Sequence, residues 1–142
     1  MSDIQEFVLD GSVTMSWYFQ DEANAYADSV RDSLLGPRRA VVPALWPLEV
    51  ANTLLVGERR KRSTPAQAAT WLSLLQAFPI VVDGETAAHA LIETLALARA
   101  RNLSAYDAAY LELAMRRGLP LATLDDKLKA EAAAVGVALY TS

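Results

Sequence analysis

The stretch "EFVLDGSVTMSWYF", residues 6–19, passes from an apolar segment through one acid into a second apolar segment. Residues 7–9 predict a short strand that is buried on both faces, whereas residues 12–18 are typical of a turn that opens into a helix. Asp10 then stands where the strand ends. Asp-Gly turn chemistry alone would explain it, since aspartate bonds its own backbone and glycine tolerates a positive φ. The rest of the chain has to decide between a turn and a function.

The remaining sequence repeats this alternation of strand and helix. Short β-rich runs occur at residues 4–10, 39–44, 79–83, 119–124 and 137–140. Helical patterns fill residues 22–35, 46–62, 63–78, 84–101, 103–118 and 125–136. Strands that alternate with helices favour right-handed crossovers and a parallel sheet. We therefore expect a three-layer α/β domain with a mostly parallel five-stranded sheet and helices on both faces.

Length and composition favour one domain over residues 1–142. The chain has 142 residues, of which 53% are hydrophobic and 21% charged, so it can build a sizeable core. It shows no internal repeat and no flexible linker. No apolar run is long enough to span a membrane, and the start "MSDIQEF" carries acids instead of the basic region of a signal peptide. We expect a cytoplasmic protein with no membrane association.

The content of cysteine and histidine limits the kinds of site that the chain can build. It has no cysteine and a single histidine, His89, to which we assign no role. Thiolate and multi-histidine metal sites are therefore excluded, and any metal must be held by oxygen ligands. The net charge of −4 argues against bulk attraction to nucleic acid, although a local basic patch can still act.

Four acids stand where the local pattern predicts an apolar residue. Glu49 and Asp107 fall on the apolar stripes of their helices, and Asp125 ends the run "LATL" as Asp10 ends "FVL". Each has an ordinary explanation when taken alone. Asp10 can form a turn, Asp107 and Asp125 can cap helices, and Glu49 can form a buried hydrogen bond to Asn52 or to an arginine.

Taken together, the four acids indicate a shared site. Ligands of parallel α/β sheets collect at the carboxyl ends of the strands, where Asp10 and Asp125 are expected. Burial of several carboxylates side by side is unfavourable unless a positive charge joins them. Mg²⁺ and Mn²⁺ prefer oxygen ligands and keep bound waters. We expect Asp10, Glu49, Asp107 and Asp125 to form one divalent-metal site.

With these residues assembled, the sequence resembles the PIN-domain ribonucleases, and within them the VapC-type toxins of prokaryotic toxin–antitoxin modules. The resemblance is carried, in order, by "VLDGSVTMSWY", "PLEVANTLL", "LSAYDAAYLELAMRRGLPLATLDDKL" and "GVALY". It implies a PIN-like fold and a Mg²⁺- or Mn²⁺-dependent endoribonuclease that hydrolyses RNA with a metal-activated water. It also implies a homodimer and a small cognate antitoxin protein.

The resemblance assigns roles residue by residue. Asp10, Glu49, Asp107 and Asp125 match the catalytic and metal-binding acids, and Ser12, Asn52 and Thr123 match polar positions around them. Two positions depart from the usual pattern. Gly11 stands where an alanine-like residue is commoner, and Asp126 adds an acid beside Asp125. We assign the site to Asp125 because it directly follows the strand, and we expect Asp126 to cap the next helix, with assistance through water as its alternative role.

The cations and aromatic residues that could contact a substrate each have two interpretations. Candidate cations are the tract "ERRKR" at residues 58–62 and Arg38, Arg39, Arg99, Arg101, Arg116 and Arg117. Each is also an ordinary helix-end cation. Tyr18, Trp46 and Trp71 can stack on bases of a single strand, but aromatic residues at helical spacing are more often part of a core.

Two other classes of protein compete with the nuclease interpretation. A phosphoacceptor receiver domain is also a doubly wound α/β fold, but it needs an acidic pair after the first strand and a lysine after the fifth, and the sequence has neither. A catalytically inactive PIN-like binding module would keep the fold without the reaction. Only a cleavage assay separates that module from an enzyme.

Overall fold

The computed structural model describes residues 4–142, which form a parallel sheet with strand order β3-β2-β1-β4. The strands are β1 (Gln5–Leu9), β2 (Arg38–Val42), β3 (Ile80–Val82) and β4 (Leu121–Ala122). Strand β1 is central, and Val8 pairs with Val41 on one side and Leu121 on the other. Its apolar residues 7–9 are fully buried, as the opening stretch predicted.

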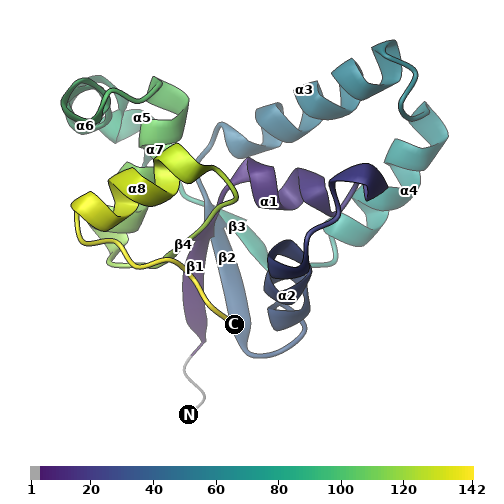
Figure 1. The fold of residues 1–142 in the computed structure, drawn as a ribbon, viewed down its shortest axis with the longest axis horizontal. Coiled ribbons are helices and arrows are strands. Elements are labelled where there is room, and N and C mark those ends of the chain that lie inside the picture. The colour runs from purple at the N-terminus through teal and green to yellow at the C-terminus, as the bar shows by residue number, and fades with distance from the viewer. Residues whose placement is uncertain (1–3) are drawn as a thin grey trace.

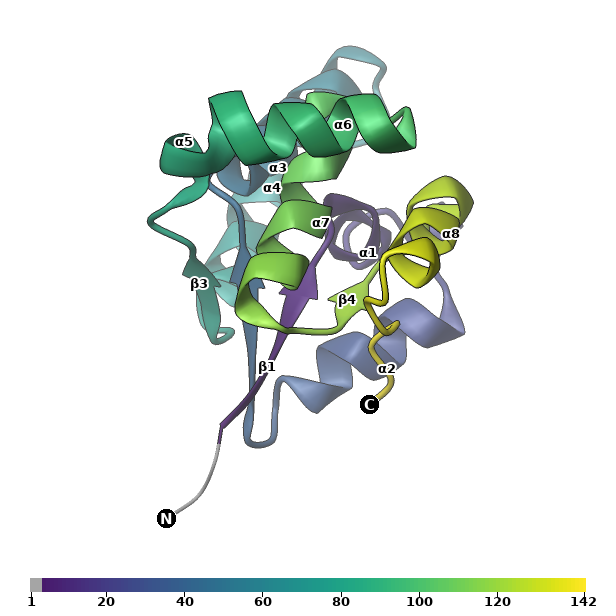
Figure 2. The same ribbon diagram turned by 90° about the vertical axis from the view of Figure 1, so that its left-hand side faces the viewer.

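Helices cover both faces of this sheet (Figures 1 and 2). They are α1 (Gly11–Ser16), α2 (Ala25–Ser33), α3 (Trp46–Arg59), α4 (Pro65–Leu75), α5 (Thr86–His89), α6 (Leu95–Arg101), α7 (Ala105–Arg117) and α8 (Asp126–Ala134), with a 3₁₀ turn η1 (Gln20–Glu22) and a π-helical turn η2 (Ala90–Thr94). Helix α7 crosses one face, while α1 and α2 lie on the other. The predicted three-layer α/β architecture is confirmed. Within residues 4–142 no helix combines the length and the apolar character that a membrane span needs.

The predicted helix ends are largely confirmed by their capping residues. Helix α4 begins with a complete capping box, in which Thr64 and Gln67 bond each other's backbone N–H, and Pro65 occupies the first turn. Helix α7 ends at Gly118, whose φ of 64° is the left-handed conformation that glycine adopts at little cost. These residues fix the start of α4 and the end of α7.

The prediction of a fifth strand at residues 137–140 is wrong. This segment makes only an isolated parallel bridge, Leu121 to Leu139. Leu121 is the one residue of β4 that offers its backbone to the outer edge, where its N–H donates to the carbonyl of Ala138 at 2.9 Å and its carbonyl accepts from the N–H of Tyr140 at 2.8 Å. Strand β4 ends one residue later, so the pairing cannot extend along it.

Residues 84–101, predicted as one helix, form consecutive helical segments whose hydrogen-bonding pattern changes along the chain. They divide into α5, the π-helical turn η2 and α6, and Thr94 of η2 is buried. A π turn is a single local change in hydrogen bonding, and the average helical spacing of residues 84–101 does not locate it.

Candidate active site

The carboxyl ends of the parallel strands open into a pocket of about 460 Å³ that contains all four predicted acids. We call it the acidic pocket, and its lining is Asp10, Gly11, Ser12, Met15, Glu22, Glu49, Val50, Thr53, Asp107, Leu124 and Asp125. A larger and more apolar hollow of about 620 Å³ lies between α3, α4 and β3, but Glu58 is its only charged lining residue. The chemistry therefore points to the acidic pocket.

Asp10 is held at the end of β1 by two hydroxyl groups. Its Oδ2 accepts hydrogen bonds from Ser12 Oγ at 2.6 Å and from Thr123 Oγ1 at 2.7 Å. The side chain is only 7% exposed, and burial raises its pKa above the ordinary value of 3.8 in spite of these hydrogen bonds. Asp10 precedes α1, but its side chain makes no hydrogen bond that caps the helix.

The same two hydroxyl groups set the position of the loop that follows β4. Ser12 Oγ accepts a hydrogen bond from the N–H of Leu124 at 3.0 Å, and Thr123 Oγ1 accepts one from the N–H of Asp125 at 3.1 Å. Ser12 and Thr123 therefore connect Asp10 to Asp125 across the ends of two neighbouring strands. Sequence comparison with the PIN pattern had placed both hydroxyls near the acids, and the structure agrees.

Glu49 lies in the first turn of α3 and has a partner that the sequence did not suggest. Its Oε1 accepts a hydrogen bond from the phenol of Tyr110, which is fully buried on α7. Burial raises the pKa of Glu49 above 4.5, and the charges of Asp10 and Asp107 add to this shift. Asn52, one of the two kinds of partner that the sequence offered for Glu49, is exposed and does not line the pocket. Tyr110 follows Asp107 by three positions, which places both on one face of α7, but no sequence pattern links it to Glu49 on α3.

Gly11 lies beside the side chains of Tyr110 and Glu49. A Cβ at this position would lie 3.7 Å from Tyr110 Oη and 3.8 Å from Glu49 Oε1, which are ordinary contact distances. The alanine-like residue that is commoner here would therefore also fit, and the departure at Gly11 leaves the pocket unchanged.

Asp107 is not the cap of α7. The cap is Ser104, whose Oγ accepts a hydrogen bond from the backbone N–H of Asp107 at 3.0 Å. The carboxylate of Asp107 lines the pocket, where burial raises its pKa above 3.8 and the charges of Asp10 and Asp125 raise it further. The helix-cap explanation for Asp107 is therefore wrong.

Asp125 combines two tasks, and the assignment of the cap to Asp126 is wrong. Asp125 Oδ1 accepts a hydrogen bond from the N–H of Leu128 at 2.8 Å and so caps α8, while its side chain also lines the pocket. Asp126 is 99% exposed and lies 3.9 Å from Lys129 in the first turn. The helix starts one residue earlier than expected, which gives the cap to the first of the two acids.

The acids of the pocket repel one another and lack basic partners. Among residues 4–142 no lysine, arginine or histidine forms an ion pair with Asp10, Glu49, Asp107 or Asp125. Glu22, which sequence reasoning missed, also lines the pocket, but it is paired with Arg62 at 2.8 Å. Uncompensated carboxylates in one hollow are unfavourable without a cation.

These donors suit a divalent metal of the Mg²⁺ class. Within residues 4–142 no three acidic or histidine side chains stand close enough together to hold an ion as they are. Mg²⁺ usually keeps several waters and takes only one or two carboxylates directly, so a pocket with spaced oxygen donors satisfies its requirements. The donor set is made of carboxylates and hydroxyls, which agrees with that preference.

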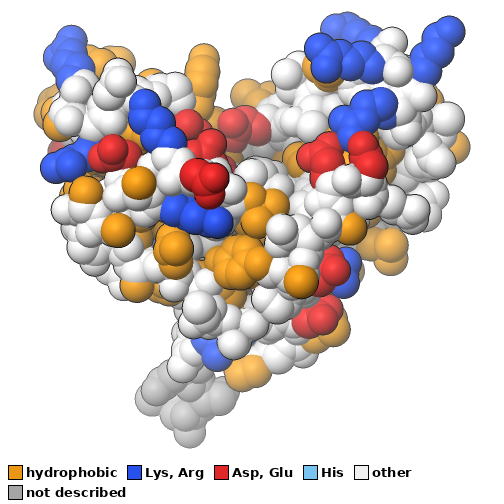
Figure 3. Space-filling model, viewed as in Figure 1, with side chains coloured by type: hydrophobic (Ala, Val, Ile, Leu, Met, Phe, Trp, Pro, Cys, Tyr) orange, Lys and Arg blue, Asp and Glu red, His pale blue; other side chains and the backbone are white. Residues whose placement is uncertain are grey.

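The pocket lies at the bottom of a notch between two lobes (Figure 3). Acidic side chains gather at its base, and basic side chains stand on the lobes to either side. On one lobe the end of α3 carries exposed Arg59, Arg60 and Lys61. Several other candidate cations are engaged elsewhere, because Arg39 and Arg117 pair with Glu6. Basic side chains therefore stand on both sides of the notch, and the acidic pocket lies at its base.

The family model of the PIN domain matches residues 7–133. The chain belongs to the PIN domain family. PIN domains are typically nucleases and typically use divalent metal ions, which agrees with the oxygen donors of the acidic pocket. The strand order β3-β2-β1-β4 also differs from the 2-1-3-4-5 order of receiver-type folds, so the receiver interpretation is dropped.

Two solved structures share this PIN fold. PAE2754 from Pyrobaculum aerophilum has a TM-score of 0.61 and 22% identity, covering 92% of this chain and 87% of that chain. A toxin–antitoxin complex from Klebsiella pneumoniae has a TM-score of 0.59 and 19% identity, covering 87% of this chain and 90% of that chain. No curated protein matches the sequence. At these identities the two structures support the fold alone.

Proposed function

We propose that this PIN domain is an endoribonuclease that depends on Mg²⁺ or Mn²⁺ and hydrolyses RNA phosphodiester bonds. The observation that carries the proposal is the set of four carboxylates in one pocket, none of which has a basic partner within residues 4–142. Residues 1–142 act as a single nuclease domain in this proposal. A bound divalent cation would supply an activated water and would stabilise charge on the scissile phosphate.

The side chains of the pocket share the work of holding the metal and the substrate. Asp10, Glu49, Asp107 and Asp125 are the proposed ligands. Ser12 and Thr123 bond one oxygen of Asp10 and so orient the carboxylate. Tyr110 does the same for Glu49 from beneath the pocket. Because these supporting groups are neutral hydroxyls, they position the acids without cancelling the charge that attracts the cation.

The biological setting we propose is a cytoplasmic toxin–antitoxin pair. The structure from Klebsiella pneumoniae is a toxin–antitoxin complex, and the sequence resembles VapC-type toxins. A small antitoxin protein encoded by the neighbouring gene would then bind this chain, and the chain would form a homodimer. Co-expression with that gene, followed by light scattering of the purified species, tests both associations. A monomer that recovers no partner would contradict them.

Cleavage of RNA by the purified chain tests the central proposal. Total RNA is incubated with the protein in Mg²⁺, in Mn²⁺ and in EDTA, and the new RNA ends are sequenced. We expect cleavage with either metal and none in EDTA. Cleavage that persists in EDTA would reject the metal-dependent mechanism. No cleavage with either metal would favour the alternative, a catalytically inactive PIN-like binding module.

A further inference from the structure

A third hollow, of about 590 Å³, lies between the end of α1 and helix α4. Aromatic rings form much of its wall, and polar groups stand among them. We call it the aromatic pocket, and its main lining residues are Tyr18, Phe19, Arg62, Ser63, Gln67 and Trp71. Tyr18 and Trp71 were two of the three aromatic residues that the sequence offered as base-stacking candidates. The third, Trp46, is buried and donates a hydrogen bond to Thr14, so it belongs to the core.

Close packing holds the rings of the aromatic pocket in place. The ring centroids of Tyr18 and Trp71 are 4.9 Å apart. Phe19 packs against α3 at Gly57, where a Cβ would come within 2.9 Å of the phenyl ring. The guanidinium carbon of Arg62 lies 4.0 Å above the centre of that ring. The pocket is therefore formed by rings whose faces and edges are already positioned, as a stacking site requires.

Two buried hydroxyl groups of this pocket have no hydrogen-bond partner. They are Tyr18 Oη and Ser63 Oγ, and neither makes a bond within residues 4–142. A buried hydroxyl without a partner is unfavourable, and most such groups in proteins are satisfied. A ligand with a polar edge and a flat apolar face would meet both the hydroxyls and the rings. The heterocyclic base of a nucleotide has this chemistry.

The aromatic pocket is connected to the acidic pocket through α1 and η1. Helix α1 starts at Gly11 in the acidic pocket and has six residues, a length of about 9 Å. That length corresponds to about three stacked nucleotides of one strand. Glu22 of η1 lines the acidic pocket, while its partner Arg62 lines the aromatic one. A strand bound at the acids can therefore reach the rings within a few nucleotides.

We propose that the aromatic pocket binds one base of the single-stranded RNA that is cut in the acidic pocket. This inference rests on the proposed function. The exposed Arg59, Arg60 and Lys61 lie next to Arg62 and supply charge for the neighbouring phosphates. A segment of a protein partner would fit better in the larger apolar hollow between α3, α4 and β3, where most of the lining side chains are apolar.

Binding of a fluorescein-labelled single-stranded RNA, measured by anisotropy in EDTA so that no cleavage occurs, tests the inference. Trp71→Leu should weaken binding by roughly 5- to 150-fold, the range for loss of one stacked base. The slope of log Kd against log salt should stay unchanged, because no phosphate contact is removed. Leu55→Ala is the control, since Leu55 lines the apolar hollow and not the aromatic pocket, and it should bind like the wild type.

RNAs with one abasic nucleotide, moved along the strand, show whether the contact is with a base. At one position the abasic RNA should bind wild type and Trp71→Leu equally. Tyr18→Phe provides a second variant that keeps the ring and removes a hydroxyl without a partner. It should weaken binding several-fold without lowering the melting temperature.

The possible failures are distinguishable. The base-binding pocket is rejected if Trp71→Leu binds RNA like the wild type. It is also rejected if Trp71→Leu binds every abasic RNA more weakly than the wild type does. Neither result contradicts metal-dependent cleavage. If Trp71→Leu weakens binding only of the protein encoded by the neighbouring gene, the pocket serves a protein and the inference is also rejected. If the wild type binds but never cleaves RNA, the pocket stands and the proposed function fails.

Discussion

Asp10 and Asp83 occupy equivalent places in the sheet but have opposite surroundings. Each directly follows a parallel strand, β1 or β3, and they are 7% and 6% exposed. Asp10 is bonded by the hydroxyls of Ser12 and Thr123 and its pKa is raised, mainly by burial. Asp83 is bonded by Arg116, with Nη2 to Oδ2 at 2.7 Å, and this lowers its pKa. Asp83 therefore has a cation bonded to it within the fold, whereas Asp10 is held by neutral hydroxyl groups.

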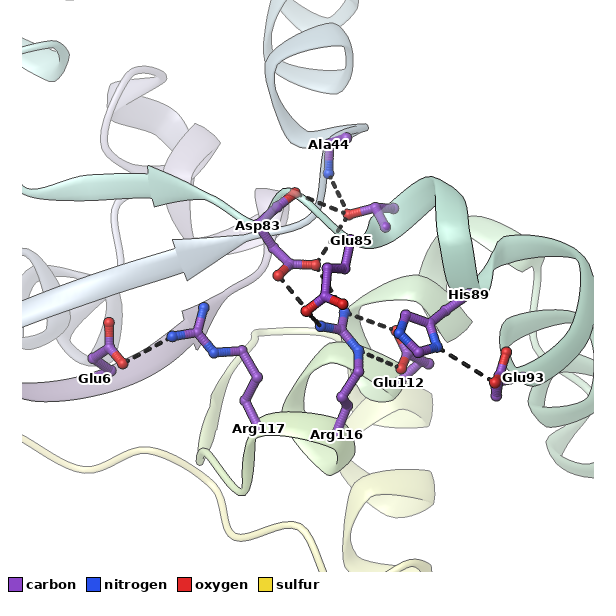
Figure 4. A network of polar contacts seen from close by, with 10 residues as sticks. Glu6, Ala44, Asp83, Glu85, His89, Glu93, Glu112, Arg116 and Arg117 are labelled. Atoms are coloured by element: carbon purple, nitrogen blue, oxygen red, sulfur yellow. Dashed lines mark hydrogen bonds and ion pairs between the residues drawn. The ribbon is translucent and has the colours of Figure 1, made fainter.

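The surroundings of Asp83 explain what a structural acid requires (Figure 4). Arg116 is 17% exposed and also contacts Glu112 at 2.8 Å and Glu85 at 3.6 Å, so one guanidinium joins α7 to the segment after β3. The acidic pocket has the same kind of acids but uses neutral hydroxyls to hold them. A fold that needed Asp10 only for stability would place a cation beside it. This contrast supports the proposal that the acidic pocket binds a metal ion.

The largest effect that separates the two sites is on cleavage. Asp10→Asn should reduce RNA cleavage by about 10²–10³-fold or more, the size of effect found when one electrostatic contact to a transition state is removed. Asp83→Asn is the matched control at the end of β3. It should leave cleavage unchanged and lower the free energy of unfolding by about 1.5–3 kcal/mol, because a charged hydrogen bond is lost. Initial rates in Mg²⁺ and chemical denaturation in EDTA measure both.

Equal activity of Asp10→Asn and wild type would remove Asp10 from the proposed site. Loss of cleavage in Asp83→Asn at a temperature where it remains folded would show that the network around Arg116 also shapes the acidic pocket.

The next largest effect is on stability at Arg116. Arg116→Met should lower the free energy of unfolding by about 3–5 kcal/mol, because it leaves Asp83 and Glu112 buried without a cation. For a domain of this size the melting temperature would fall by roughly 10–20 °C. Differential scanning calorimetry measures the shift. A fall no larger than that of the exposed Arg31→Met would mean that the network contributes little.

The sequence predicted the layers of the fold because they depend on local pattern. The buried run at residues 7–9 and the helical patterns at residues 63–78 and 103–118 each depend on neighbours within one strand or a few helical turns. The fifth strand failed because pairing depends on what its neighbour offers. Strand β4 presents only Leu121 to the outer edge, and the sequence of residues 137–140 does not show how short that neighbouring strand is.

The positions of the acids and of the supporting hydroxyls Ser12 and Thr123 were predictable, but the partner of Glu49 and the cap of α8 were not. Asp10 and Asp125 are visible as charges at strand ends, and the structure brings them into one pocket with Glu49 and Asp107. The partner of Glu49 was missed because Tyr110 comes from a different helix, and only packing brings the two together. The cap of α8 was assigned one residue late, since a pair of adjacent acids leaves the starting residue ambiguous.

Metal binding should stabilise the wild type through the acidic pocket and not through the Asp83 network. At a hundredfold excess over Kd, Mg²⁺ would add about 2.7 kcal/mol to the free energy of unfolding. Asp107→Asn should show a smaller shift with Mg²⁺, and in EDTA it should melt no lower than the wild type because one repulsive charge is removed. Asp83→Asn should keep the full Mg²⁺ shift. Melting curves with and without Mg²⁺ give all three values.

A loss of several degrees by Asp107→Asn in EDTA would indicate that this carboxylate is a structural partner. An unchanged Mg²⁺ shift in that variant would exclude Asp107 from the metal site.

The smallest predicted effect is a difference in how stability depends on pH in EDTA. The raised pKa of Asp10 means that the folded state binds a proton more readily than the unfolded state, whose value is near 3.8. Stability should therefore increase as pH falls from neutral toward 3.8, by about 1.4 kcal/mol for each pKa unit of the shift. The lowered pKa of Asp83 acts in the opposite sense. Its stabilisation is complete above 3.8 and is lost only as pH falls further, through its folded-state value.

Melting temperatures of the wild type, Asp10→Asn and Asp83→Asn across this pH range separate the two contributions. Asp10→Asn should show a smaller increase on acidification, with the remainder coming from Glu49 and Asp107, whose pKa values are also raised by burial. Asp83→Asn should keep the increase of the wild type and lose part of the decline at lower pH. If Asp10→Asn followed the wild-type curve, the carboxylate of Asp10 in the wild type would have the same proton affinity in the folded and unfolded states. The contrast between a hydroxyl-held and an arginine-held acid would then have no energetic basis at Asp10.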